Sequence, residues 1–206
     1  MVCTGNLCRS PMAEYLAVAA LQAGLGPYAS SVTVRSAGTR ALDGAHMHHA
    51  TTTLLAERGL SPDGFTARRV DAAMLSSADL VLCAEREHRS IVVTMVPKIL
   101  RRTFTLREFA RLTAGITPSE ITLSDTTVDV VRGCGNALVA RAVGCRGLNR
   151  PERPTDDDID DPIGSSIEVF RSCAEQISAA LAQPLQLLTR AVRMSSRPLP
   201  ARQRPK

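Results

Sequence analysis

Residues 3–11 read CTGNLCRSP, a cysteine and an arginine separated by five residues, directly before a predicted helix. Ser10 is a favoured N-cap residue and Pro11 suits the first helical position, so we expect the helix to begin here. Backbone N–H groups at a helix N-terminus point towards an anion, and the helix dipole favours negative charge there. The sequence therefore predicts a phosphate-binding loop.

Two side chains of this loop carry the chemistry that it predicts. Cys3 is a nucleophile as a thiolate, a form that the positive field of the loop favours. Arg9 can hold two phosphate oxygens through parallel hydrogen bonds. Gly5 permits close approach of the anion, and Asn6 suits a left-handed turn. The alternative is that the segment holds only buried cysteines at the start of a packed helix.

Apolar and helical patterns alternate along the rest of the chain. Residues 80–83 form a continuous apolar run, which is typical of a parallel strand buried on both faces. We expect further strands at residues 32–36 and 103–106, and helices at residues 11–23, 50–58, 71–77, 85–96, 107–112, 134–143 and 165–182. The pattern predicts an α/β fold, a small doubly wound parallel sheet of four strands flanked by helices.

The predicted loop should follow the first strand of that sheet, yet only Met1 and Val2 precede Cys3. We therefore expect the first strand to be truncated in this chain. A natural start upstream of Met1 is the interpretation that we favour, and the alternative is a domain that lacks part of a core strand.

The positive charge of the chain is concentrated near its end. The formal net charge is +5, but residues 190–206 hold six basic residues and no acidic ones, which leaves 19 basic and 20 acidic residues elsewhere. We expect one domain over residues 1–189 and a basic, proline-rich, disordered tail over 190–206. A near-neutral domain predicts no nucleic-acid partner, and no apolar run is long enough to predict a membrane span.

The cysteine pattern indicates a reducing compartment. The six cysteines are too widely spaced for a disulfide scaffold, so we expect a cytoplasmic protein. No pair of C-x-x-C motifs is present, and the histidines at 46, 48 and 49 have no fourth ligand placed by spacing. The sequence therefore predicts no metal site and no cofactor.

The stretch CTGNLCRSPMAE (residues 3–14) resembles the low-molecular-weight protein tyrosine phosphatase family. The resemblance continues at SAGT (residues 36–39), at ADLVL (residues 78–82) and at the pair Asp161-Pro162, which is similar to the acid loop of the family. It implies the fold of that family and hydrolysis of phosphate monoesters. Residues 113–155 match poorly, and we interpret them as an insertion.

The resemblance and the chemistry together give each site residue a role. Cys3 attacks phosphorus to form a cysteinyl-phosphate, and Arg9 stabilises the oxygens. Asp161 protonates the leaving oxygen and then activates water, a role that Pro162 favours for it over Asp158 and Asp160. The remaining phosphate-binding residues are expected to be Thr4, Gly5, Asn6, Leu7, Cys8 and Ser10.

Three expectations about the site come from the family. Ser10 donates a hydrogen bond to the Cys3 sulfur. Cys8 either forms a reversible disulfide with Cys3 or is a small buried side chain, and both interpretations stay open. Where family members have aromatic pocket walls, this chain has Leu42 and Ile163, so stacking against a substrate ring is lost.

The predicted activity is metal-independent hydrolysis of phosphotyrosine, with a phosphorylated protein or a small phosphomonoester as the substrate. One alternative is a thiol-dependent arsenate reductase on the same fold. A thioredoxin-coupled relay is not expected, because Ser90 stands seven residues after Cys83. Another alternative is a non-catalytic phosphate-binding module.

Overall fold

The structure, a computed structural model, describes residues 1–123 and 129–196 of the chain. Within these residues one parallel sheet has the order β2-β1-β3-β4. Its strands are short, and they are β1 (Val2–Cys3), β2 (Ala37–Gly38), β3 (Val81–Cys83) and β4 (Thr103–Thr105). The predicted parallel α/β fold is confirmed, and β1 lies inside the sheet with only two paired residues.

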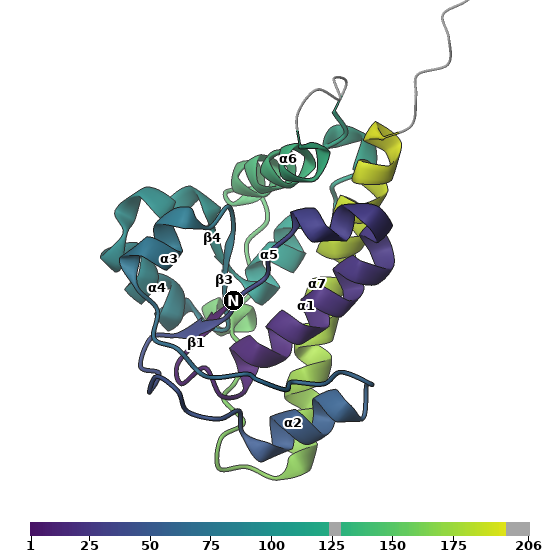
Figure 1. Cartoon of the computed structure of the whole chain (residues 1–206). Helices are drawn as coiled ribbons and strands as arrows, with labels where there is room; N and C mark the ends of the chain where they lie inside the picture. The colour runs from purple at the N-terminus through teal and green to yellow at the C-terminus, as the bar shows by residue number, and fades with distance from the viewer. Residues whose placement is uncertain (124–128, 197–206) are drawn as a thin grey trace, which may run out of the picture.

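Helices connect the strands and cover the sheet (Figure 1). The α-helices are α1 (Arg9–Leu25), α2 (His49–Ala56), α3 (Ala72–Ser77), α4 (Arg86–Met95), α5 (Leu106–Thr113), α6 (Val130–Cys145) and α7 (Ile167–Ser195). Four 3₁₀ helices in the described residues are η1 (Gly26–Ser31), η2 (Pro97–Arg102), η3 (Pro118–Glu120) and η4 (Pro154–Asp157). No helix in the described ranges is both long and apolar enough to cross a bilayer.

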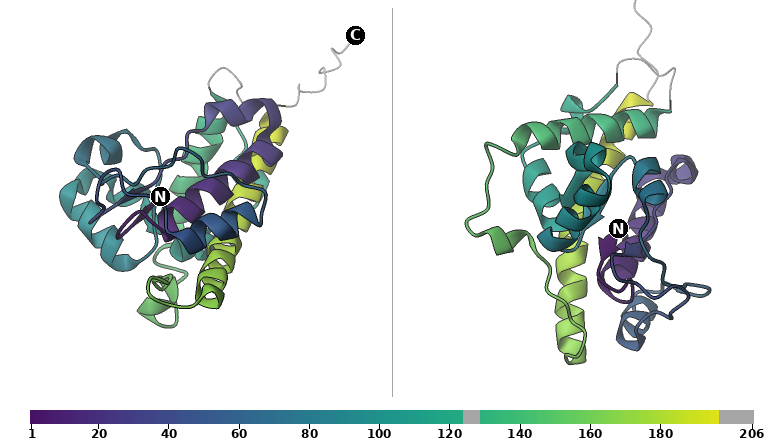
Figure 2. Two further views of the ribbon diagram at one scale, coloured as in Figure 1. Left: turned by 60° about the horizontal axis from the view of Figure 1, so that its bottom comes forward. Right: turned by 90° about the vertical axis from the view of Figure 1, so that its left-hand side faces the viewer.

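Side chains of the strands alternate between two hydrophobic cores, one on each face of the sheet. Val81 and Cys83 pack in the smaller core with residues of α3 and α4. Leu82 and Phe104 point the other way, into the larger core formed with α1, α5, α6 and α7. Figures 1 and 2 show the same division, with α3 and α4 on one side and the α1–α7 pair on the other. The sheet is therefore doubly wound, as predicted.

The first helix does not begin as predicted. α1 starts at Arg9, its N-cap is Cys8, and Pro11 occupies the third helical position. Ser10 is thus not the N-cap, and its hydroxyl is used inside the loop instead. Pro11 remains acceptable in the first turn because the N–H groups there have no partner within the helix.

The expected strand at residues 32–36 is wrong. These residues follow η1 without joining the sheet, and the strand is Ala37–Gly38. The β-branched residues of this stretch favour an extended backbone, but a strand also needs a neighbouring strand with which to form hydrogen bonds. β1 offers only Val2 and Cys3 for pairing.

The end of the last helix is also wrong, because α7 continues through Pro184 to Ser195. A proline inside a helix costs about 3 kcal/mol. Burial of Leu187, Ala191 and Val192 beyond it offsets that cost. The predicted disordered tail therefore does not include residues 190–195, and residues 197–206 lie outside the described residues.

Residues 113–123 and 129–155 contribute side chains to the main core. Ile121, Cys134 and Ala142 are fully buried in it, and α6 packs against both α5 and α7. Figure 1 shows α6 lying across the end of α7. The described part of this segment is therefore integral to the packing of the domain, and its interpretation as an insertion stays a prediction.

Gly38 is required by a close approach of β2 to the predicted phosphate loop. A Cβ at this position would lie 2.4 Å from the Thr4 oxygen and 2.8 Å from the Asn6 nitrogen. Gly38→Ala must push these backbone atoms apart, which we expect to destabilise the fold by about 1–3 kcal/mol. Thermal denaturation should show a fall in Tm of roughly 3–10 °C.

Gly135→Ala in α6 is the matched control, because a Cβ there meets no atom within 4 Å. It should stabilise the helix by about 0.5–1 kcal/mol. An unchanged Tm in Gly38→Ala would contradict the close approach.

Candidate functional site

The predicted loop connects β1 to α1 at the carboxyl edge of the sheet. Cys3 ends the strand and is 2 % exposed. Its Sγ atom lies 3.0 Å from the Oγ atom of Ser10 in the first turn of α1. A hydroxyl in this position can donate a hydrogen bond to a thiolate. The structure therefore brings Cys3 and Ser10 together, as the family resemblance implies.

Asn6 holds the shape of the loop. It is fully buried and has a positive φ of 55°, which asparagine tolerates better than most residues. Its Nδ2 atom donates to Ser10 Oγ at 2.9 Å and to Ser36 Oγ at 2.8 Å. Its Oδ1 atom accepts from the Arg68 backbone N–H at 3.0 Å. Asn6 therefore links three segments beneath the loop.

The backbone N–H groups of residues 5–8 are not used by the protein itself. Among the described residues none of them has a hydrogen-bond acceptor. A Cβ on Gly5 would make only ordinary contacts with Leu7 at 3.5 Å, so the packing of the loop does not require this glycine. Free amides at the start of a helix are the feature that binds anions in such loops.

The guanidinium of Arg9 is buried between two carboxylates, and the residue is only 1 % exposed. Its Nη1 atom donates to Glu85 Oε1 at 2.5 Å and to the Ile159 carbonyl at 2.8 Å. Its Nη2 atom lies 2.8 Å from Asp161 Oδ2 and donates to Thr4 Oγ1 at 3.3 Å. Arg9 therefore connects the loop, the end of β3 and the acidic segment, which is residues 156–161.

The charge of Arg9 is secure in this environment. Burial alone would lower the pKa of the guanidinium, but the Asp161 and Glu85 carboxylates outweigh burial and raise it. The Nε atom is buried and has no hydrogen-bond partner among the described residues. A buried N–H without a partner costs free energy. Arg9 thus keeps one donor available for a ligand.

Asp161 is the acidic residue that reaches the loop. Its Oδ2 atom contacts Arg9, and its Oδ1 atom accepts from the Ile163 N–H at 3.3 Å. Asp158 is used differently, because its Oδ1 atom caps α4 by accepting from the Arg86 N–H at 2.7 Å. Asp161 therefore contacts Arg9, whereas Asp158 caps a helix, and the role of Asp161 as the acid stays a prediction.

Glu85 and His88 belong to the site and were missed in the sequence. His88 is 2 % exposed, and its Nε2 atom shares a 2.8 Å hydrogen bond with Thr4 Oγ1. Its Nδ1 atom lies 3.4 Å from Glu85 Oε2. Carboxyl ends of parallel strands share one edge of a sheet. The position of Glu85, just after β3, was the available signal.

Burial keeps three other thiols in the protonated form. It raises the pKa of Cys8, Cys83 and Cys173 to about 12 each. All six cysteines lie in the described residues and none forms a disulfide. Cys8 is therefore a small buried side chain here, and whether it pairs with Cys3 under oxidation stays a prediction.

Leu42 and Ile163, which we expected to line the substrate pocket, lie on two segments that start at the phosphate loop. Leu42 follows residues whose amides bond to the loop, since Thr39 N donates to the Cys3 carbonyl at 2.8 Å. Ile163 follows Asp161. Both are exposed, at 78 % and 49 %. Of the three histidines at 46, 48 and 49, His48 caps α2 with its side chain, and its ring stacks on Phe170 with the ring centroids 4.7 Å apart.

A parallel α/β sheet whose inner strand ends in a cysteine–arginine anion loop defines a class of phosphate-binding proteins. The family profile described as "Low molecular weight phosphotyrosine protein phosphatase" matches residues 1–117. The chain belongs to this family.

Two relatives illustrate the similarity. The chain is 33 % identical over 103 residues to the low molecular weight protein-tyrosine-phosphatase Etp of Escherichia coli K12, covering 50 % of this chain and 64 % of Etp. It is 37 % identical over 110 residues to a protein-arginine-phosphatase of Bacillus subtilis 168, covering 52 % and 69 %. The match thus spans less than two thirds of Etp.

Solved structures resemble this chain over a greater length. The low molecular weight protein tyrosine phosphatase from T. tengcongensis has a TM-score of 0.60 and 25 % identity, covering 88 % of this chain and 92 % of its own. The YwlE arginine phosphatase from Geobacillus stearothermophilus has a TM-score of 0.60 and 24 % identity, covering 90 % and 88 %. The fold therefore extends well beyond the residues that match in sequence.

His88→Gln tests the buried imidazole beside the loop. Burial and the nearby Arg9 charge lower the pKa of His88 to about 4, while an unfolded histidine titrates near 6.5. Between pH 4 and pH 6.5 the unfolded state binds a proton at His88 that the folded state does not bind. The neutral ring therefore makes its full contribution to the free energy of unfolding above pH 6.5, and this contribution is lost as the pH falls towards 4. Gln keeps a polar group for Thr4 and removes this titration.

We expect wild type to lose on the order of 2 kcal/mol more stability than His88→Gln between pH 7 and pH 4.5. Urea unfolding at both pH values measures this difference. His49→Gln, at an exposed histidine beginning α2, is the control and should behave as wild type. Equal pH dependence in wild type and His88→Gln would contradict the neutral buried ring.

Proposed function

We propose that this chain hydrolyses phosphate monoesters without a metal, with protein phosphotyrosine as the substrate and a cysteinyl-phosphate as the intermediate. One observation carries the proposal. The Arg9 guanidinium, six residues after Cys3 on the same loop, lies 2.8 Å from Asp161. A nucleophile, an anion clamp and an acid thus lie around one set of free amides.

In the first step the Cys3 thiolate attacks phosphorus, and the bond to the leaving oxygen breaks. Ser10 donates a hydrogen bond to the sulfur, since its hydroxyl is 3.0 Å away. The free amides of residues 5–8 bind the equatorial oxygens, on which charge accumulates. Asp161 gives its proton to the leaving oxygen, so that the product leaves as a neutral alcohol or phenol.

Arg9 must exchange partners when phosphate binds. A phosphate dianion takes the unused Nε donor and the Nη2 donor that now faces Asp161. Glu85 and the Ile159 carbonyl keep Nη1 in place during the exchange. Release from Arg9 frees the Asp161 carboxyl to meet the leaving oxygen, which couples substrate binding to placement of the acid.

In the second step Asp161, now ionised, removes a proton from water as that water attacks the phosphorus. The bond between phosphorus and Cys3 breaks, and inorganic phosphate leaves. No step requires a metal, because Arg9 and the loop amides supply the positive field.

An aryl phosphate fits the surroundings of the loop. The flanking segments present the apolar side chains of Leu42 and Ile163 to solvent, at 78 % and 49 % exposure. The free thiols support a cytoplasmic location. Since relatives are named for both phosphotyrosine and phosphoarginine, kcat/KM on matched peptides decides the substrate. We expect the phosphotyrosine peptide to be preferred, and a preference for phosphoarginine would overturn this choice.

Cys3→Ser should remove turnover of p-nitrophenyl phosphate while phosphate still binds, because a serine hydroxyl in this loop lacks the nucleophilicity of a thiolate. Steady-state assays and a phosphate titration measure the two properties. Binding without turnover in wild type would instead indicate a phosphate-binding module. Reduction of arsenate with a small thiol, in place of hydrolysis, would indicate a reductase.

Asp161→Asn should lower kcat/KM, which reports the first step alone, by about 10²–10⁴-fold on an alkyl phosphate, whose leaving oxygen needs a proton. The loss on p-nitrophenyl phosphate should be smaller, because nitrophenolate leaves without protonation. Asp160→Asn, at the exposed neighbour, is the control and should retain wild-type rates. Equal losses on both substrates would contradict the acid role.

A further inference from the structure

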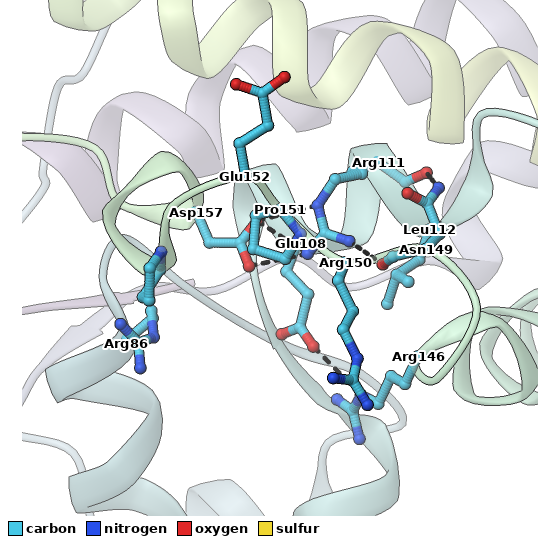
Figure 3. Close-up of a pocket in the computed structure, with 11 residues that line it drawn as sticks. Arg86, Glu108, Arg111, Leu112, Arg146, Asn149, Arg150, Pro151, Glu152 and Asp157 are labelled. Carbon is cyan, nitrogen blue, oxygen red and sulfur yellow. Dashed lines mark hydrogen bonds and ion pairs between the residues drawn. The ribbon is translucent and has the colours of Figure 1, made fainter.

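A polar cavity lies beside the acidic segment, outside the loop of Cys3 and Arg9. It has a volume of about 480 Å³ and lies between α5, the end of α6 and residues 149–157 (Figure 3). This size suits a small molecule. Four arginines line it, namely Arg86, Arg111, Arg146 and Arg150, together with the acids Glu108, Glu152 and Asp157.

Two of these arginines are held rigidly by the protein. Arg111 donates from Nη2 to both carboxylate oxygens of Asp157, at 3.0 and 2.8 Å. Arg146 donates from Nε to Glu108 at 3.1 Å, and its guanidinium lies 4.1 Å from the centre of the Phe104 ring. Every guanidinium nitrogen of Arg111 and Arg146 donates to a protein oxygen, so these two arginines form a fixed wall of the cavity and leave the pairing with a ligand to the other two.

The other two arginines carry charge that the described residues do not neutralise. Neither Arg86 nor Arg150 has a carboxylate within salt-bridge distance in the described parts of the chain. Glu108 and Asp157 are already paired. Figure 3 shows the Glu152 carboxylate pointing away from Arg146 and Arg150. The cavity is therefore positively charged.

We propose that this cavity binds a compact anion that bears phosphate groups. Guanidinium groups recognise phosphate through paired hydrogen bonds, and the four arginines and three acids of the lining leave the cavity with a net positive charge. No cysteine lines the cavity, so the anion is bound there and not hydrolysed by a cysteine. The chemistry fits either a free small phosphate compound or a second phosphate group on a substrate.

An anion in the cavity contacts the two segments that hold Arg9. Arg86 directly follows Glu85, and its backbone N–H donates to Asp158 at 2.7 Å. Ile159, the next residue, gives its carbonyl to Arg9. Binding at Arg86 therefore acts on the same backbone that positions the guanidinium in the loop.

Pyrophosphate is a suitable probe, and ¹H–¹⁵N NMR of the full chain separates the two sites. Resonances of residues 108–112 and 146–157 report on the cavity, and those of residues 3–10 report on the loop. We expect the cavity resonances to follow their own saturation curve. In the double variant Arg86→Gln/Arg150→Gln, the cavity dissociation constant should rise at least tenfold, with the loop curve unchanged.

The matched control is Arg35→Gln/Arg190→Gln, which removes the same charge at two exposed positions outside the cavity. It should bind pyrophosphate as wild type does. Cavity resonances that do not move up to 10 mM pyrophosphate, or an equal weakening in both double variants, would overturn the proposal. This readout needs no turnover, so it stands apart from the proposed hydrolysis.

A kinetic arm identifies the source of the anion. If a second phosphate on the substrate occupies the cavity, a doubly phosphorylated peptide has a lower KM than the singly phosphorylated one, and the Arg86→Gln/Arg150→Gln variant removes this difference. If a free compound occupies it, the two peptides have equal KM values and pyrophosphate alone saturates the cavity.

Discussion

The buried guanidinium of Arg9 is the interaction on which the rest of the site depends. A charge that is 1 % exposed is tolerated only when it is paired and hydrogen-bonded. Glu85, Asp161 and the Ile159 carbonyl supply these partners from two separate segments. Removal of any one partner leaves charge partly uncompensated, so the end of β3 and the acidic segment are held in place by the same group that clamps the anion.

The loop itself is shaped by residues that do no chemistry. Asn6 takes the left-handed conformation and ties Ser10, Ser36 and the Arg68 backbone together. Gly38 lets β2 approach the loop more closely than any side chain would allow. These contacts fix the loop backbone without using its amides, so the amides remain free for a ligand. The loop therefore needs little change of conformation on binding.

Local chemistry made part of this site predictable from sequence. The spacing of Cys3 and Arg9, the apolar run of β3 and the Asp-Pro pair all act through near neighbours. Glu85 and His88 were not predicted, because their roles depend on which strands are adjacent in the sheet. The passage of α7 through Pro184 was not predicted for a related reason, since the burial of Leu187 and Val192 outweighs a strong local preference.

The residues that match the family in sequence end before two of the residues that contact Arg9 in the structure. The family profile ends at residue 117, whereas the fold shared with solved structures covers about nine tenths of the chain. The contact from Arg9 to Ile159 crosses that boundary, and so does the ion pair with Asp161. Between these parts, residues 113–123 and 129–145 contribute to the core, and Arg146 with residues 149–152 lines the arginine-rich cavity. Ile159 and Asp161 lie beyond the residues that the family profile matches, yet both remain at the site, because their carbonyl and carboxylate together compensate one buried charge.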